Sequence, residues 1–161
     1  MAKYYYGITS HRHLLDVIGK VVTAFGGGYN ARALLLGTCA TETHCGTFPD
    51  IHPDRLGVGI GQCDQIRLDD TKMHIRAHDR ERLLDLGYDI DKVELIDLAY
   101  DPVLAISIMR LAYKRIPVVI PSCDDLLGLA NYWKDHYNSH HPNAAGTPEK
   151  FILDWKCHIS Q

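Results

Sequence analysis

The helical spacing of apolar residues, repeated in separate segments, most constrains what this chain can fold into. Between Ser10 and Phe25 the apolar side chains recur at helical intervals, namely Leu14, Leu15, Ile18, Val21, Val22 and Phe25. Gly26-Gly27-Gly28 then ends that helix. The one β-like run, Val118-Val119-Ile120, is bracketed by prolines, which predicts an extended connector rather than a strand. These patterns predict a mostly α chain.

Capping residues divide the rest of the chain into further helices. Asn30 is predicted to cap a second helix that runs through Leu34, Leu35 and Leu36 toward Glu42. Later helices are predicted from Gln65 to Leu86 with an interruption near His78-Asp79, from Asp101-Pro102 to Arg115, from Ser122–Asp125 to about Tyr137-Asn138, and from Thr147-Pro148-Glu149 to about Cys157. The stretch from Gly46 to Gln62, rich in glycine, proline and aspartate, is predicted to be a long irregular loop or small hairpin.

Size and composition indicate one soluble-type domain spanning residues 1–161. The chain has 46% hydrophobic and 23% charged residues, which is ordinary for a folded protein of this length. Its net charge of −3 gives no basic field for nucleic-acid binding. The N-terminus has no basic-then-apolar signal pattern, and no apolar run could span a membrane. We therefore expect synthesis in the cytoplasm, with the five cysteines reduced.

Glu42 is the strongest candidate for a chemical role. It stands at the end of an apolar helical run that begins at Leu34. Apolar surroundings disfavour the charged carboxylate and raise its pKa, as a general acid working near neutral pH requires. A glycine-dense segment with a single polar amide, Gly57-Val58-Gly59-Ile60-Gly61-Gln62, follows soon after. Its glycines would let a backbone approach a ligand closely.

Three segments together resemble the lysozyme-like lytic transglycosylases, and more narrowly their small phage and prophage members. Ala40-Thr41-Glu42-Thr43-His44-Cys45-Gly46 is similar to the family's Ala-x-Glu-Ser-x-Phe-Gly segment. Residues 57–62 resemble its Gly-Leu-Met-Gln segment, and residues 129–138 resemble the late helix that carries its Ala-Tyr-Asn motif. The chain departs from the family at Thr43, Gly61 and Cys63, and it lacks the glycine that follows the late motif.

The resemblance implies a lysozyme-like helical domain that cleaves the MurNAc–GlcNAc β-1,4 bond of peptidoglycan. It assigns Glu42 as the single catalytic acid and base, with no cofactor and no metal. It also implies substrate contacts from six further residues: Thr43, Gly59, Ile60, Gln62, Tyr137 and Asn138. By the same match, the Tyr137 hydroxyl is expected to contact the Glu42 carboxyl. The expected partners are the glycan strand and other phage virion proteins, and the expected place of action is the virion or the periplasm.

Several other interpretations fit parts of the sequence. A hydrolytic lysozyme would need a second carboxylate, for which Asp50, Asp54 and Asp64 are candidates, although Asp64 is well placed to cap the helix near Gln65. A metal site could use His44, Cys45, His52 and Cys63, with His11 or His13 added, although these spacings match no strong zinc signature. A Cys–His nucleophile could use the same residues. A non-catalytic virion or assembly protein on the same fold would not need Glu42.

Overall fold

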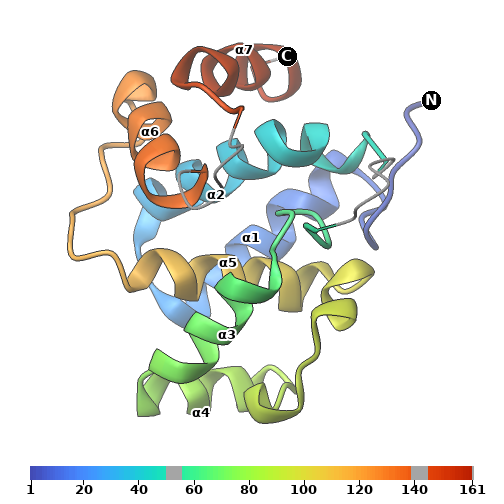
Figure 1. The fold of residues 1–161 in the computed structure, drawn as a ribbon. Coiled ribbons are helices and arrows are strands. Elements are labelled where there is room, and N and C mark those ends of the chain that lie inside the picture. The colour runs from blue at the N-terminus through green and yellow to red at the C-terminus, as the bar shows by residue number, and fades with distance from the viewer. Residues whose placement is uncertain (50–55, 139–144, 161) are drawn as a thin grey trace.

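Seven α-helices joined by turns make up the computed structural model, which describes residues 1–49, 56–138 and 145–160 (Figure 1). The helices are α1 (His11–Phe25), α2 (Gly28–Thr43), α3 (Gln65–His74), α4 (Ala77–Asp85), α5 (Pro102–Lys114), α6 (Leu126–Trp133) and α7 (Pro148–His158). Short 3₁₀ turns occur at His44–Gly46 (η1), Ile90–Lys92 (η2) and Leu95–Ala99 (η3), and a π-helical turn, η4, covers Lys134–Asn138. Within these ranges β pairing is limited to an isolated bridge. The prediction of a mostly α chain is confirmed.

The helices pack in two groups around α1 and α2. Helix α1 packs against α5 and α2, and α3 packs against α5. Helix α2 also contacts α6 and α7, which lie at the opposite end of the molecule from α3 and α4 (Figure 1). The end of α2, where Glu42 lies, is therefore held between α7 and the central helices. In the described ranges, none of the helices has the length and apolarity needed to cross a membrane.

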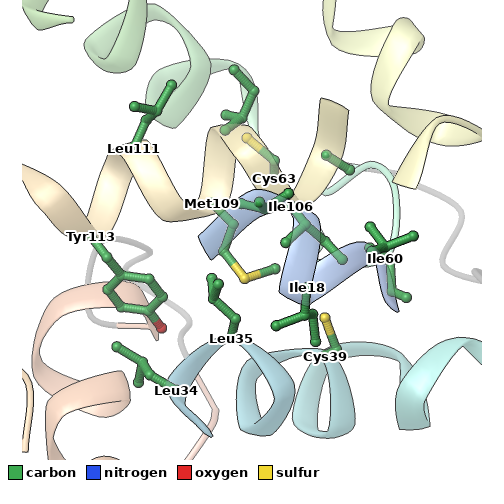
Figure 2. Close-up of a cluster of buried hydrophobic side chains, with 14 of the residues drawn as sticks. Ile18, Leu34, Leu35, Cys39, Ile60, Cys63, Ile106, Met109, Leu111 and Tyr113 are labelled. Carbon is green, nitrogen blue, oxygen red and sulfur yellow. The ribbon is translucent and has the colours of Figure 1, made fainter. Parts of the chain in front are cut away.

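The core lies between α1, α2, α5 and the turn that precedes α3. Figure 2 shows side chains of these elements in contact, among them Ile18, Leu35, Ile60, Ile106 and Met109. All five are at most 2% exposed. Burying each such side chain contributes about 1.5–3 kcal/mol relative to leaving it in water. Because Ile60 belongs to this core, the glycine-rich turn around it is anchored rather than free.

Side-chain caps begin α1, α5 and α7, and each of these helices starts within one residue of its predicted start. Ser10 accepts a hydrogen bond from the His13 amide at the start of α1. The side chains of Asp101 and Thr147 likewise accept a hydrogen bond from a backbone amide at the starts of α5 and α7. A proline follows each of these two residues in the first turn. A cap of this kind stabilises a protein by about 0.5–2 kcal/mol because it satisfies an otherwise unpaired backbone donor.

Two predicted caps are wrong, and the structure gives the reason for each. Helix α2 begins at Gly28, ahead of Asn30, whose Oδ1 instead accepts a hydrogen bond from the Cys123 amide at 2.9 Å. Helix α6 begins at Leu126 and is capped by Asp125, while Ser122 accepts hydrogen bonds within a turn that precedes the helix. Short polar side chains can satisfy a turn or a distant segment as readily as a helix end.

The loop before α3 was predicted to be irregular or a small hairpin, and its described part contains one isolated antiparallel bridge without strands. Val58 and Cys63 exchange backbone hydrogen bonds of 2.8 and 3.0 Å around the turn from Gly59 to Gln62. The helical pattern from Gln65 to Leu86 is broken at residues 75–76, three residues earlier than predicted. The 3₁₀ turns at residues 90–99 were not predicted.

Candidate active site

The three segments that carry the family resemblance meet at one pocket. This pocket of about 260 Å³ is lined by Glu42, Leu56, Gly57, Gln62, Asp64, Arg67, Tyr137 and Asn138. Glu42 comes from the last turn of α2, Gln62 from the glycine-rich turn, and Tyr137 from the π-helical turn η4. π-Helical turns occur often at functional sites because they shift the side chains that follow.

Glu42 is partly buried, and protein surrounds its carboxyl group. The Trp133 indole nitrogen donates a hydrogen bond to Glu42 Oε1 at 3.3 Å. Burial raises the pKa of Glu42 from its ordinary value of 4.5 to about 7, and the nearby Asp154 carboxylate acts in the same direction. The positive charges of Arg67 and Lys150 and the Trp133 hydrogen bond oppose this rise in pKa. Near neutral pH, Glu42 is therefore present both as the protonated acid, which can donate a proton, and as the carboxylate, which can accept one.

Thr43, Gly59 and Ile60 were expected to contact a substrate, but the structure gives them supporting positions. Thr43 is 1% exposed, and its hydroxyl donates to the Ile60 carbonyl at 2.8 Å, which ties α2 to the glycine-rich turn. The Ile60 side chain is fully buried in the core (Figure 2). Gly59 has a φ of 76°, and a side chain there would meet the Leu98 carbonyl. These residues position the turn and leave no side-chain surface for a ligand.

Gln62 lines the pocket, but its amide nitrogen already has a partner. The Gln62 Nε2 donates to the Gly59 carbonyl at 3.0 Å, across the turn. Gln62 also has a positive φ of 48°, which is uncommon for a residue with a side chain. The side chain therefore braces the turn while one of its surfaces faces the pocket.

Tyr137 and Asn138 also line the pocket, but the predicted contact between Tyr137 and Glu42 is replaced by another. The Tyr137 hydroxyl donates to the Gly61 carbonyl at 2.6 Å. The Tyr137 ring stacks on Tyr113, with ring centres 5.2 Å apart. Asn138 accepts a hydrogen bond from the Lys134 ammonium at 3.0 Å. Tyr137 thus joins η4 to the glycine-rich turn. The hydrogen bond to the Glu42 carboxyl comes from Trp133 instead.

Arg67 and Trp133 are site residues that the sequence reasoning did not single out. The Arg67 guanidinium lies 3.7 Å from the centre of the Tyr137 ring and donates to the Tyr137 carbonyl. Arg67 is one of 17 lysines and arginines, and no motif separates it from the others. Trp133 lies within the quoted late segment, four residues before Tyr137. This helical spacing was a signal that both side chains could face the same region.

A Cys–His nucleophile does not fit the surroundings of the cysteines. All five cysteines lie among the described residues, and they form no disulfide. Burial raises the pKa of both Cys45 and Cys63 to about 12, so these thiols stay protonated and are poor nucleophiles at neutral pH. His52, Asp50 and Asp54 lie outside the described residues.

The hydrogen bond from Trp133 gives a direct prediction about the acidity of Glu42. This bond stabilises the carboxylate and lowers its pKa, so Trp133→Phe is expected to raise the Glu42 pKa above about 7. The pKa is measured from the ¹³C shift of the side-chain carboxyl as pH is varied. Trp155→Phe replaces the other tryptophan, on α7, and is expected to leave the titration unchanged. An unchanged or lower pKa in Trp133→Phe would contradict the assigned contact.

Comparisons of this chain with protein-family models, with curated proteins and with solved structures found no match. The function is therefore inferred from the residues of the pocket and their geometry.

Proposed function

We propose that this chain is a peptidoglycan lytic transglycosylase with a lysozyme-like fold, in which Glu42 is the only acid and base. The proposal assigns it to phage-associated wall lysis or to opening the wall during DNA entry. The observation that carries it is Glu42 itself. This carboxyl lines a pocket formed by three separated segments, and its pKa is raised to about 7.

The proposed reaction uses Glu42 twice. Protonated Glu42 first donates its proton to the glycosidic oxygen, so the bond from that oxygen to the muramic acid anomeric carbon breaks with oxocarbenium character. The resulting Glu42 carboxylate then accepts the proton of the C6 hydroxyl of the same muramic acid residue. The C6 oxygen bonds to the anomeric carbon and forms a 1,6-anhydro ring. Glu42 ends protonated, and no water is consumed.

The position of Asp64 supports the mechanism with a single carboxylate. A lysozyme-type hydrolase needs a second carboxylate that acts as nucleophile or as base toward water. Among the described residues that line the pocket with Glu42, Asp64 is the other carboxylate. Its Oδ1 accepts the Arg67 amide at 2.8 Å and caps α3, as the sequence predicted. An oxygen held by a helix cap is a weaker candidate for base or nucleophile than a free one.

The chemical form of the products tests this proposal. Purified peptidoglycan is digested with the protein, and the released fragments are analysed by mass spectrometry. Fragments that end in 1,6-anhydro-muramic acid are expected. Reducing muramic acid ends, heavier by one water, would replace the proposal with a hydrolase and direct attention to Asp64, Asp50 and Asp54. Intact glycan would contradict any cleavage function and favour a binding or assembly protein.

A further inference from the structure

Two histidines and an aspartate gather beside the pocket, where the end of α2 meets α7. The Asp154 Oδ1 lies 3.9 Å from His44 Nε2 and 4.0 Å from His158 Nε2. One ligand atom from each of the three residues lies within 4.8 Å of the other two. Asp154 and His158 are four residues apart on one face of α7, and His44 reaches them from the turn that follows Glu42. The pocket mechanism proposed above does not use His44 or His158.

The backbone turns sharply to bring His44 to this position. His44 and Cys45 have φ values of 50° and 55°, so two consecutive residues with side chains occupy the left-handed region. This conformation is unfavourable for residues other than glycine and is found where surrounding structure enforces it. Here it ends α2 and brings the His44 imidazole against α7, where it stacks on His158 with ring centres 4.3 Å apart.

The Asp154 carboxylate is oriented so that one of its oxygens faces the two histidines. The Lys150 ammonium lies 2.6 Å from the other carboxylate oxygen, Asp154 Oδ2. That contact fixes the carboxylate and leaves Oδ1 toward the histidines, as outer partners of metal ligands commonly do.

We propose that His44, Asp154 and His158 bind one Zn²⁺ ion, with water completing the coordination. Imidazole nitrogen and carboxylate oxygen are ordinary zinc ligands. The d electrons of Zn²⁺ impose no preferred geometry on them. Zinc ligands at about 2.0–2.1 Å lie about 3.3–3.4 Å from one another, so each histidine must move toward Asp154 by roughly half an ångström. The stacked rings must also rotate about χ2, a torsion that is broad for histidine.

The bound ion would link α7 to the end of α2, next to Glu42 but outside its pocket. The ligand set differs from the sequence-based alternative, since it keeps His44 and has two residues of α7 in place of Cys45, His52 and Cys63. Because binding to the folded state alone stabilises a protein, zinc is expected to raise the melting temperature. This inference does not depend on the proposed glycan cleavage, and its test requires no activity measurement.

Calorimetric titration of the reduced full-length protein with Zn²⁺ alone tests the site. One ion per chain and a higher melting temperature are expected for the natural sequence. His158→Ala removes a ligand and is expected to weaken binding by at least about 10–100-fold, with no zinc-dependent rise in melting temperature. The matched control is His74→Ala. His74 pairs with Asp70 across one turn of α3, at 3.2 Å, and within the part of the chain that the structure describes it belongs to no such three-residue group. This control is expected to bind zinc like the natural sequence.

Equal zinc affinity in His158→Ala and the natural sequence would overturn the proposal, as would the absence of stoichiometric binding. Circular dichroism of the metal-free variant verifies that it is folded. Substitution of Co²⁺ for Zn²⁺ identifies the ligand atoms by a second route. Nitrogen and oxygen ligands give only weak visible bands, as expected here. A strong sulfur-to-cobalt charge-transfer band would instead assign the ion to a thiol, such as the neighbouring exposed Cys157, and would contradict the proposed ligand set.

Discussion

Replacing Glu42 with glutamine is expected to abolish glycan cleavage while the protein stays folded. Glutamine has nearly the same shape but neither gives nor takes a proton near neutral pH, so both steps of the proposed reaction lose their acid and base. Proton transfer by a positioned side chain contributes about 10²–10⁴-fold to a rate, and a loss of at least this size is expected. The measurement is the rate at which soluble fragments are released from purified peptidoglycan.

The Glu42→Gln variant is expected to remain folded for two physical reasons. The amide oxygen of glutamine can accept the hydrogen bond that Trp133 now donates to Glu42. In addition, the folded-state pKa of Glu42 is about 7, above its ordinary value of 4.5, so the folded state holds the proton more tightly than the unfolded state. The contribution of Glu42 to stability is therefore full below pH 4.5 and is lost as pH rises to about 7. Above pH 7 the variant should be at least as stable as the natural sequence.

A matched control separates catalysis from a general effect of lost charge. Glu81→Gln makes the same change at an exposed position of α4, away from the pocket, and is expected to keep the natural rate of cleavage. If Glu42→Gln released fragments as fast as Glu81→Gln, Glu42 would not be the acid, and the proposed function would fail at its central residue.

Phe151→Ala is expected to lower the free energy of unfolding by about 3–5 kcal/mol, the usual range for removing a fully buried phenylalanine. The Phe151 side chain is 0% exposed on the inner face of α7. It lies against Gly37 of α2, where a methyl group would collide with its ring, and its ring centre is 5.7 Å from that of Trp133. Truncation leaves a cavity between α2, α6 and α7 and removes support from the tryptophan that bonds Glu42.

Denaturant unfolding of purified variants measures this loss of stability. Leu153→Ala changes an apolar residue of the same helix that is 60% exposed, and it is expected to change the free energy of unfolding by no more than about 0.5 kcal/mol. Phe151→Leu retains most of the buried volume and is expected to lie between the two. If Phe151→Ala were as stable as Leu153→Ala, the described packing of α7 on α2 would be wrong.

Local patterns were enough to predict most of the helices. The spacing of apolar residues predicted α1, and the capping residues Asp101 and Thr147 predicted the starts of α5 and α7. These signals are local because a cap and the donor that it satisfies lie within one turn. The caps predicted at Asn30 and Ser122 were wrong because each side chain found another partner, and in the case of Asn30 that partner is in a distant segment.

The contacts within the candidate site could not be read from the sequence in the same way. The resemblance selected Glu42, Gln62, Tyr137 and Asn138, which all line the pocket. The resemblance predicted a contact between the Tyr137 hydroxyl and the Glu42 carboxyl. In the structure Trp133 donates the hydrogen bond to that carboxyl, and Tyr137 donates to the Gly61 carbonyl. A π-helical turn changes which side chains share a face, and an apolar spacing pattern does not reveal such a turn.

The sequence by itself determined a mostly helical chain and the position of one glutamate at the end of an apolar helix. Only the tertiary structure decided what surrounds that glutamate. Its principal hydrogen-bond donor, Trp133, lies 91 positions away along the chain, and Asp154, which also affects its pKa, belongs to the last helix. The acidity of a carboxyl group depends on how much water is removed from it and which charges approach it, and both are set by the packing of distant segments.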